Sequence, residues 1–271
     1  MKDQFVNAGG INTRYIEEGQ GTPLILIHGG GAGADSWGNW KGCFPLLSKH
    51  FRVLAIDMVG FGKTDKPDPD TFLYDENARI KHVIDFIEAM RLERVNLVGN
   101  SMGGGASLGV CMKRSELVNK LVLMGSAGLS KVAEMSEELR VILTYKPSKD
   151  HMRQLVQALT HDGFEVDEDM VSYRYNITIQ PEVMRAYGAM MKWQMEHGGL
   201  FYPEEEIRQV KHKTLIVNGK QDKVVPSTHG WKFSQLLENS WLCLIPNCGH
   251  WAMIEHPKEF CDITTWFLTT V

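Results

Sequence analysis

The sequence predicts an α/β fold in which a mostly parallel sheet of eight strands is covered by helices on both faces. Short apolar runs recur along the chain, and each is followed by a turn containing glycine, aspartate or asparagine. Such continuous runs are typical of strands buried on both faces. Helical patterns separate several of the runs, which favours a parallel sheet. One long helical segment interrupts the alternation and predicts an insertion.

The first two runs flank a turn at residues 7–10 and are expected to form an antiparallel hairpin at the edge of the sheet. The six later runs supply the rest of the sheet, with helices expected at 80–90 and 104–112 between them. The expected strands are 5–6, 13–16, 24–27, 53–56, 95–98, 121–124, 215–217 and 241–245.

The regular alternation stops after Gly128. Residues 130–208 contain no strong strand run but are rich in charge, methionine and aromatic residues, with a helical pattern at 183–196. We therefore expect a core formed by residues 1–129 and 209–271, and an inserted helical lid formed by residues 130–208. An insertion at this place would lie over the carboxyl ends of the strands, where open α/β sheets bind ligands.

Composition excludes several classes of function. The 271 residues are 43% apolar and 23% charged, with a formal net charge of -4, so neither nucleic acid nor an anionic membrane is an expected partner. The chain has no apolar run long enough for a membrane span and no signal-peptide pattern at its start. Its five cysteines are odd in number and lack CxxC spacing. We therefore expect free thiols, no metal site and a cytoplasmic location.

The strongest local signal is the pattern G-x-S-x-G at residues 99–103, which follows a predicted strand and precedes a predicted helix. That context is the one in which a nucleophile elbow occurs, with the serine lifted above the sheet on a tight turn. Ser101 is therefore the expected nucleophile. A buried serine in a glycine-rich turn is the alternative.

A serine nucleophile needs a base, and the base needs an acid to orient it. Of the ten histidines, only His250 directly follows a late strand and a tight turn. Asp222 closes the turn after the strand 215–217, whereas the turn after 121–124 contains no acid. The order Ser101, Asp222, His250 is the order expected for this elbow. Asp222 would fix the tautomer of the imidazole.

Three consecutive glycines, Gly29 to Gly31, follow the strand 24–27. Glycine lets a backbone N–H approach a substrate oxygen closely. We expect the oxyanion hole to consist of the N–H groups of Gly30 and Met102. The preceding His28 is expected to pack within the turn rather than to act chemically.

The same glycines permit an alternative interpretation, in which the chain is a dinucleotide-binding protein. Gly29-x-Gly31-x-x-Ala34 fits a dinucleotide-binding fingerprint, with Asp57 at the end of the next strand. Against it, the stretch 35–40 contains two tryptophans and a glycine, which makes a poor start for the helix that should hold pyrophosphate. It also leaves the elbow and His250 unexplained.

These motifs resemble the α/β-hydrolase superfamily over nearly the whole chain. A narrower resemblance is to the meta-cleavage product hydrolases, which split carbon–carbon bonds in ring-opened aromatic compounds, and within them to the hydrolases for bicyclic ring-fission products. The resemblance rests on the segments 28–34 and 37–40, on GNSMGG at 99–104, on Gly249-His250-Trp251, and on Arg174-Tyr175 followed by Gln180-Pro181. Ala32 stands where members of the family often have proline.

The resemblance implies a substrate class, 2-hydroxy-6-oxo-6-aryl-hexa-2,4-dienoates, and roles for further residues. Arg174 would bind the dienoate carboxylate, Asn39 and Asn100 would hydrogen-bond the polar end, and Trp251 would pack against the substrate. The expected substrate-binding residues also include Gly29, Gly31 and Trp193. Trp193 would line an aryl pocket with Met190, Met191 and Met195, although core packing is the alternative for such methionines.

The resemblance also implies a reaction without metal or organic cofactor, because the dienoate serves as its own electron sink. We expect a homo-oligomer. Two alternatives remain open: a carboxylesterase or lipase on the same scaffold, and a catalytically silent binding protein. Arg174 distinguishes the carbon–carbon bond hydrolase from the esterase, because a hydrolase of neutral esters has no need of a buried cation that faces the site.

Overall fold

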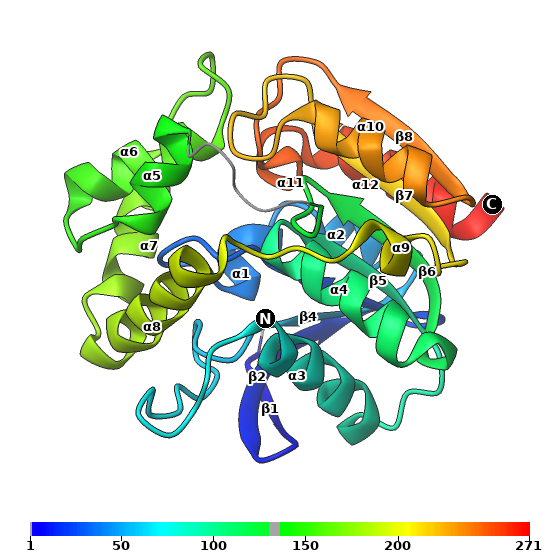
Figure 1. Ribbon diagram of the computed structural model, residues 1–271, viewed down its shortest axis with the longest axis horizontal. Helices are drawn as coiled ribbons and strands as arrows, with labels where there is room; N and C mark the ends of the chain where they lie inside the picture. Colours follow the sequence, from blue (N-terminus) through cyan, green and yellow to red (C-terminus); the bar gives the residue numbers. More distant parts are fainter. Residues whose placement is uncertain (1, 130–135) are drawn as a thin grey trace.

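The computed structural model describes residues 2–129 and 136–271 and contains one eight-stranded sheet with helices on both sides (Figure 1). The strand order is β1-β2-β4-β3-β5-β6-β7-β8. The strands are β1 (Gln4–Ala8), β2 (Ile11–Glu18), β3 (Pro23–Ile27), β4 (Arg52–Ile56), β5 (Val95–Asn100), β6 (Val118–Met124), β7 (Lys213–Gly219) and β8 (Ser240–Ile245). Each of the eight expected runs lies within one of these strands, so the predicted fold class is confirmed.

The pairing of the strands agrees with the predicted edge hairpin. β1 pairs antiparallel with β2, and β2 pairs antiparallel with β4, whereas all later neighbours are parallel. The carboxyl ends of β3, β5, β6 and β7 therefore meet at one edge of the sheet. β8 differs from the expectation of burial, because it is the last strand in the order and leaves Trp241 and Leu244 exposed.

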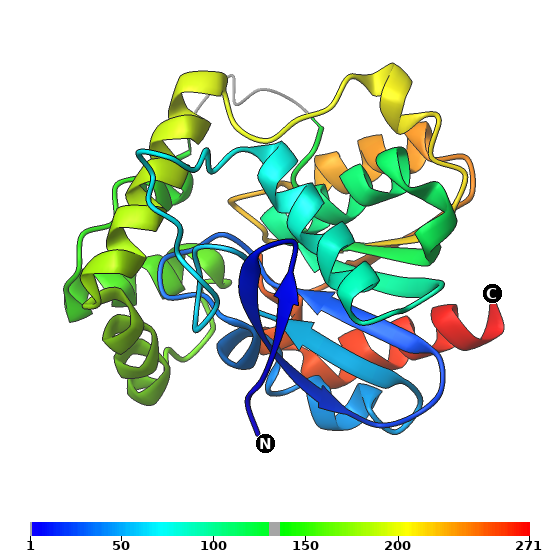
Figure 2. The ribbon, with the colours of Figure 1, turned by 90° about the horizontal axis from the view of Figure 1, so that it is seen from below.

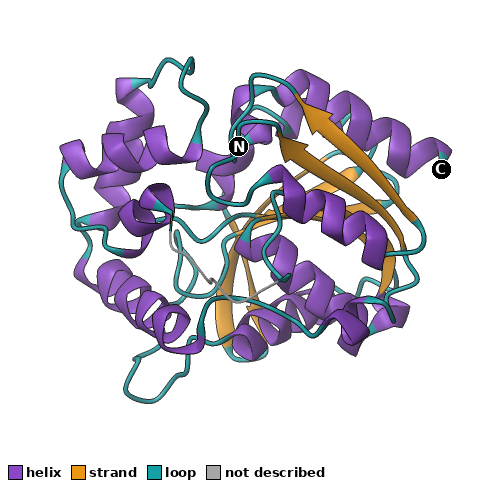
Figure 3. Ribbon diagram, turned by 45° about the horizontal axis from the view of Figure 1, so that its top comes forward, coloured by secondary structure: helices purple, strands orange, loops and turns teal. Residues whose placement is uncertain are grey.

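Helices cover both faces of the sheet (Figure 3). On one face lie α3 (Glu76–Ala89), α4 (Met102–Lys113) and α10 (Ser227–Leu236), in front of the sheet in Figure 1. On the other lie α1 (Ser36–Trp40), α2 (Phe44–Leu47), α11 (Ala252–Glu255) and α12 (Pro257–Thr270). None of the helices in the described part of the chain has the length and apolar character of a membrane-spanning segment.

Local sequence signals explain where the helices begin. The side chain of Asp75 accepts a hydrogen bond from the Ala78 N–H at the start of α3, and Ser148 does the same for the His151 N–H at the start of α6 (Lys149–Leu159). Such N-caps satisfy backbone donors that the helix itself leaves unpaired. Proline occupies the first position of α12, where its missing N–H costs nothing.

Four helices form a separate layer beside the core, within the segment that the sequence predicts to be a lid (Figures 1 and 2). They are α5 (Glu137–Leu143), α6 (Lys149–Leu159), α7 (Glu168–Thr178) and α8 (Pro181–His197). The following helix, α9 (Glu204–Ile207), contacts α4 of the core. The first six residues of the predicted lid, 130–135, lie outside the described residues.

The chain leaves the core and returns to it at one place. Gly128 forms a parallel bridge with Phe201, and the Tyr202 N–H donates to the Gly128 carbonyl oxygen at 2.9 Å. The Tyr202 hydroxyl contacts Glu76 at 2.7 Å and the Gly105 carbonyl oxygen at 2.8 Å, which ties the returning segment to α3 and α4. The segments that leave and re-enter the core therefore lie side by side at residues 128 and 201. The predicted boundaries of the lid, at residues 130 and 208, stay a prediction.

Candidate active site

Ser101 lies in a strained turn between β5 and α4. Its backbone angles are φ 53° and ψ -118°, in a region that residues with side chains rarely adopt. The two glycines of the motif permit this turn. A Cβ atom on Gly99 would lie 2.3 Å from the Gly103 carbonyl oxygen, and a Cβ atom on Gly103 would lie 2.4 Å from the Ile27 carbonyl oxygen. The turn therefore has the geometry of a nucleophile elbow.

His250 and Asp222 meet beside this turn. The His250 Nδ1 donates to Asp222 Oδ2 at 2.8 Å, and both side chains are buried. This bond leaves Nε2 as the nitrogen that can accept a proton. The other carboxylate oxygen of Asp222 accepts the N–H groups of Val224 and Val225 at 2.9 and 2.8 Å, which holds the acid in place.

The loop after β6 leaves room for this pair. A Cβ atom on Gly125 would lie 2.9 Å from His250 Nδ1 and 3.1 Å from Asp222 Oδ2. The lid also contributes, because the Leu159 carbonyl oxygen accepts the His250 backbone N–H at 3.0 Å. Ser101 and His250 line the same cavity. The structure thus brings the three predicted triad residues together.

The two predicted oxyanion donors come from residues in contact. A Cβ atom on Gly30 would lie 3.0 Å from the Met102 sulfur, and one on Gly29 would lie 2.7 Å from Asn100 Oδ1. Neither glycine has a positive φ, so close approach to the elbow explains both. Gly31 differs, because a Cβ atom there would make ordinary contacts with Leu159. Close packing therefore requires glycine at positions 29 and 30 but not at position 31.

His28 holds this glycine loop from behind, as the sequence predicts. Its Nδ1 donates to the Gly29 carbonyl oxygen at 2.7 Å, and its Nε2 accepts the Met58 N–H at 3.0 Å. Burial lowers the pKa of His28, so the ring is neutral, as these two bonds require. Its ring also contacts Phe61 edge to face.

The cavity above Ser101 is large and mostly apolar. The space within it is about 930 Å³, open solvent at its mouth included. Its polar part is lined by Ser101, His250, the oxyanion residues, Asn39, Asn100 and Trp251, whereas Asp222, the partner of His250, does not line it. The remaining wall combines core and lid residues, which are Gly29, Gly31, Ala34, Ala127, Gly128, Leu129, Leu139, Ile142, Leu143, Leu159, Met191, Gln194, Gly199, Leu200, Val224, Val225 and His229.

Several buried polar atoms at the triad end have no hydrogen-bond partner among the described residues. They are Asn39 Nδ2, Asn100 Oδ1, and the Nε and Nη1 atoms of Arg174. Arg174 does not itself line the cavity but contacts two residues that do. Its Nη2 donates to Asn39 Oδ1 at 3.0 Å, and its guanidinium lies 4.3 Å from the centre of the Trp251 ring. Burial lowers the pKa of Arg174 to about 10, so it remains a cation at neutral pH.

One predicted substrate-binding residue lies elsewhere. Trp193 is absent from the cavity wall; its ring stacks on His197 at 4.6 Å and lies 5.6 Å from the Arg79 guanidinium. The expectation of a substrate contact for Trp193 is therefore corrected. On α8, positions 190, 191 and 193 point in different directions because successive residues are 100° apart. Of the group to which Trp193 was assigned, only Met191 lines the cavity, whereas Met190 is core and Met195 is exposed.

Three polar residues of the site were not predicted from the sequence. Glu255 is a buried carboxylate on α11 that accepts the N–H groups on both sides of His250, from Gly249 at 3.0 Å and from Trp251 at 3.3 Å. Gln194 and His229 are polar residues in the otherwise apolar wall of the cavity. In the sequence, both lie far from the motifs that identify the site. The position of Glu255 five residues after His250 is the one signal available, and it does not distinguish a buried acid from an exposed one. Within the described residues, no group of three or more acidic, histidine or cysteine side chains could hold a metal ion.

Comparison with known proteins gives consistent matches. The family model described as alpha/beta hydrolase fold matches residues 22–257. The chain is 53% identical to a 2-hydroxy-6-oxo-6-(2'-aminophenyl)hexa-2,4-dienoic acid hydrolase of Metapseudomonas resinovorans, over 98% of this chain and 91% of that protein.

Two crystal structures are similar throughout. One is a serine hydrolase involved in carbazole degradation, with a TM-score of 0.91, 50% identity and coverage of 100% of this chain and 99% of that one. The other is a variant of a meta-cleavage product hydrolase, with a TM-score of 0.92, 33% identity and coverage of 99% and 98%.

Proposed function

Because the chain belongs to the α/β-hydrolase family and, within it, to the meta-cleavage product hydrolases, which hydrolyse carbon–carbon bonds, we propose that Ser101, His250 and Asp222 cleave 2-hydroxy-6-oxo-6-aryl-hexa-2,4-dienoates. The products are an aryl carboxylate and 2-hydroxypenta-2,4-dienoate, formed with the uptake of one water molecule. The relative from Metapseudomonas resinovorans is named for a substrate of this class.

The observation that carries this proposal is the unsatisfied polar cluster beside the triad. Arg174 is fully buried, and no described carboxylate lies within ion-pair distance of it. A buried cation without an ion-pair partner costs several kcal/mol. An anionic substrate group bound there would compensate this cost, because a carboxylate can accept from the free Nε and Nη1 atoms. Asn39 would donate from its free Nδ2 atom to the same polar end.

The reaction begins with ketonisation of the dienol. A proton moves from the 2-hydroxyl group to carbon 5, which separates the carbonyl at carbon 6 from the conjugated system. His250 is the group that carries this proton, because its Nε2 atom is free while Nδ1 is bound to Asp222. The free Oδ1 atom of Asn100 accepts from a hydroxyl group of the substrate.

Cleavage follows at the carbonyl of carbon 6. Ser101, or a water molecule activated by His250, adds to this carbonyl, and the N–H groups of Gly30 and Met102 stabilise the oxyanion. The bond between carbons 5 and 6 then breaks, and its electron pair passes into the 2-oxo acid fragment, which is the electron sink. Collapse releases the aryl carboxylate directly, or after hydrolysis of an acyl-Ser101 ester.

The aryl group would occupy the apolar wall formed by the lid and the loop after Asp222. Leu139, Ile142 and Leu143 of α5 line the cavity together with Val224 and Val225. His229 and Gln194 are the polar members of the wall, and burial lowers the pKa of His229. A neutral imidazole and an amide are suited to a hydrogen-bonding substituent on the aryl ring.

Comparison of Arg174→Met on a 6-aryl dienoate and on a neutral nitrophenyl ester tests the assignment. We expect kcat/KM for the dienoate to fall about 10- to 100-fold more than that for the ester, because the ester has no carboxylate. Equal losses on both substrates would contradict the role of Arg174. Strong turnover of the ester by the wild-type enzyme without turnover of the dienoate would instead support the carboxylesterase alternative.

We also propose that the enzyme is a homo-oligomer that works in the cytoplasm. The edge strand β8 supports the first point, because it is last in the sheet and leaves Trp241 38% and Leu244 40% exposed. Five free thiols support the second. Sedimentation of the wild type as an oligomer, and of Leu244→Lys as a monomer, is the expected result. A monomeric wild type would contradict the proposal.

A further inference from the structure

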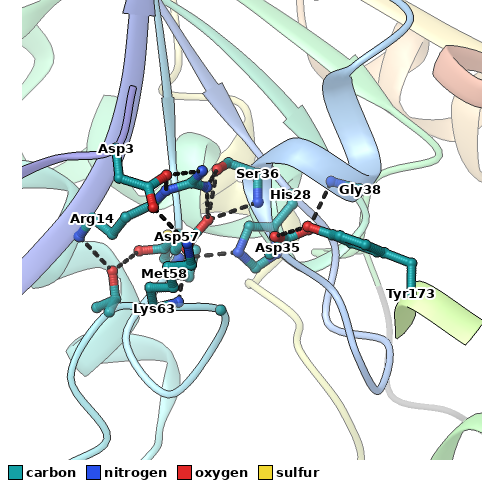
Figure 4. Close-up of polar contacts among 12 residues, drawn as sticks. Asp3, Arg14, His28, Asp35, Ser36, Gly38, Asp57, Met58, Lys63 and Tyr173 are labelled. Atoms are coloured by element: carbon teal, nitrogen blue, oxygen red, sulfur yellow. Dashed lines mark hydrogen bonds and ion pairs between the residues drawn. The ribbon is translucent and has the colours of Figure 1, made fainter. Parts of the chain in front are cut away.

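The carboxylate of Asp35 joins the two elements that carry Asn39 and Arg174 (Figure 4). Asp35 is the N-cap of α1, where its Oδ1 atom accepts the Gly38 N–H at 2.7 Å. Its Oδ2 atom accepts the hydroxyl of Tyr173 at 2.6 Å. Asn39 follows Gly38 on α1, and Arg174 follows Tyr173 on α7. A single side chain therefore fixes the lid helix to the core helix one residue away from each proposed substrate-binding group.

The backbone around this contact is shaped for close approach. A Cβ atom on Gly38 would lie 2.8 Å from Asp35 Oδ1 and 3.0 Å from the Tyr173 ring. At Gly33, where φ is +70°, a Cβ atom would lie 2.5 Å from the Arg174 carbonyl oxygen. Gly33 and Gly38 therefore let α7 lie directly on the loop that precedes α1 and on α1 itself. The Tyr173–Asp35 bond spans this seam at its outer side, where Tyr173 is 38% exposed.

Asp35 also provides a negative charge near the Arg174 guanidinium without forming an ion pair with it. The charge of Asp35 raises the pKa of Arg174 against the larger effect of burial. Burial and the neighbouring Asp57 raise the pKa of Asp35, and its contacts with Tyr173, the Gly38 N–H and Arg174 act against this increase. Neither hydrogen bond of Arg174 goes to this carboxylate; they go to Asn39 Oδ1 and the Gly38 carbonyl oxygen. The Nε and Nη1 atoms consequently stay free for a ligand.

A second buried carboxylate supports Asp35 from behind. Asp57 Oδ1 accepts the N–H and the hydroxyl of Ser36 at 2.8 and 2.6 Å, and it lies 3.1 Å from Arg14 Nη1 (Figure 4). Ser36 is the first residue of α1, directly after Asp35. The ion pair with Arg14 keeps Asp57 anchored in the core. The start of α1, and with it Asp35, is therefore held by the sheet rather than by the lid.

From these contacts we propose that Asp35 and Tyr173 are positioning residues, which hold Arg174 and Asn39 in the arrangement that receives the substrate carboxylate. The inference rests on the proposed function of Arg174. It predicts an effect on the binding of charged substrate rather than on the chemistry at Ser101, because neither residue touches the triad.

The test is Tyr173→Phe, which removes one hydroxyl and its bond to Asp35. Tyr175→Phe is the matched control, because it lies on the same helix and its hydroxyl has no hydrogen-bond partner among the described residues. We expect Tyr173→Phe to raise KM for a 6-aryl dienoate about threefold to tenfold. Its kcat for the dienoate and its kcat/KM for a neutral nitrophenyl ester should stay within twofold of the wild type. Tyr175→Phe should match the wild type on both substrates.

Asp35→Asn separates geometry from charge. Asparagine can still cap α1 with its single oxygen, and its NH₂ group can donate to the Tyr173 hydroxyl, which then accepts, but it lacks the negative charge near Arg174. If Asp35→Asn raises KM for the dienoate less than Tyr173→Phe does, the hydrogen bond is the more important contribution. If Asp35→Asn raises KM more, the charge of Asp35 is the more important one. Either result supports the proposal, whereas an unchanged KM in both variants overturns it.

The outcome also distinguishes this inference from the proposed function. If Arg174→Met affects the dienoate selectively and Tyr173→Phe does not, only the positioning role fails. If Arg174→Met lowers kcat/KM equally for both substrates, then Arg174 does not bind the substrate carboxylate. The positioning role of Asp35 and Tyr173 fails with it. Equal losses on both substrates for Tyr173→Phe, together with a lower melting temperature, would show a purely structural contact and also overturn the proposal.

Discussion

Glu255 binds His161 of the lid through two hydrogen bonds, from the His161 backbone N–H at 2.8 Å and from its ring Nδ1 at 3.0 Å. The same carboxylate accepts the N–H groups of Gly249 and Trp251, on either side of His250. Its side chain is 1% exposed. One buried acid thus connects the loop of the catalytic base to the segment that follows α6.

Replacement of this acid is expected to loosen the His250 loop. In Glu255→Gln, the amide NH₂ must face one of the N–H donors that the carboxylate now accepts, which leaves a buried donor unsatisfied. We expect kcat for the dienoate to fall about tenfold, with a smaller change in KM. Steady-state kinetics beside Glu259→Gln, an exposed acid on α12, provide the control. Wild-type kcat in Glu255→Gln would contradict this account.

Asp222→Asn is expected to reverse the tautomer of His250. The amide would donate to Nδ1, so Nε2 would carry the proton and could not accept one from Ser101 or water. We expect kcat to fall about 10⁴-fold, as in other serine triads. Asp262→Asn, an exposed residue on α12, is the control. A loss of less than tenfold would show that Asp222 does not orient the base.

Substitution by alanine should destabilise the protein at a glycine of the elbow but not at an exposed helical glycine. A Cβ atom on Gly103 would lie 2.4 Å from Ile27 O and 2.6 Å from His28 O, so Gly103→Ala must push the elbow helix away from β3. We expect a loss of about 3 kcal/mol in the free energy of unfolding. Gly188→Ala, on an exposed position of α8 with open space around it, should instead gain about 1 kcal/mol. Urea denaturation measures both, and equal effects would refute the steric argument.

Stability in acid should depend on His82. Burial lowers its pKa from 6.5 to about 3, and its neutral ring accepts from the Val59 N–H and donates to Thr13 Oγ1. Between pH 6.5 and 3 the unfolded chain binds a proton that the folded chain does not, so stability falls as the pH falls.

The contribution of His82 between pH 6.5 and 5 is about 1.6 kcal/mol, because the slope rises towards ~1.4 kcal/mol per pH unit as the unfolded imidazole becomes protonated. His82→Gln should therefore show a shallower loss of unfolding free energy over this interval than the wild type. His50→Gln, at an exposed position, should retain the wild-type slope. Parallel pH profiles for the wild type and His82→Gln would disprove this role.

The sheet was predictable because its strands are short, apolar and punctuated by glycine and aspartate. The triad was predictable for a related reason, since each member follows a strand whose place in the sheet is set by that pattern. β8 was expected to be buried but lies at the edge of the sheet, which shows what the local sequence pattern does not predict. An apolar run such as 241–245 predicts a strand, but its place at the end of the sheet depends on the order of all strands, which local pattern does not determine.

The substrate-binding residues were harder to predict because they depend on helix rotation and on contacts between distant segments. Trp193 and Met191 share α8, yet only Met191 reaches the cavity. Glu255 and Asp35 act through partly buried hydrogen bonds to residues 94 and 138 positions away. Their sequence neighbourhoods resemble those of ordinary surface acids, so only the folded chain distinguishes them.

The most direct test mixes the purified enzyme with a yellow 6-aryl dienoate and follows the loss of its visible absorbance, in parallel with Ser101→Ala and with a nitrophenyl ester as substrate. The account predicts rapid bleaching by the wild type, none by Ser101→Ala and little turnover of the ester. Persistence of the dienoate together with strong turnover of the ester would contradict carbon–carbon bond cleavage as the function, while leaving the fold and the triad in place.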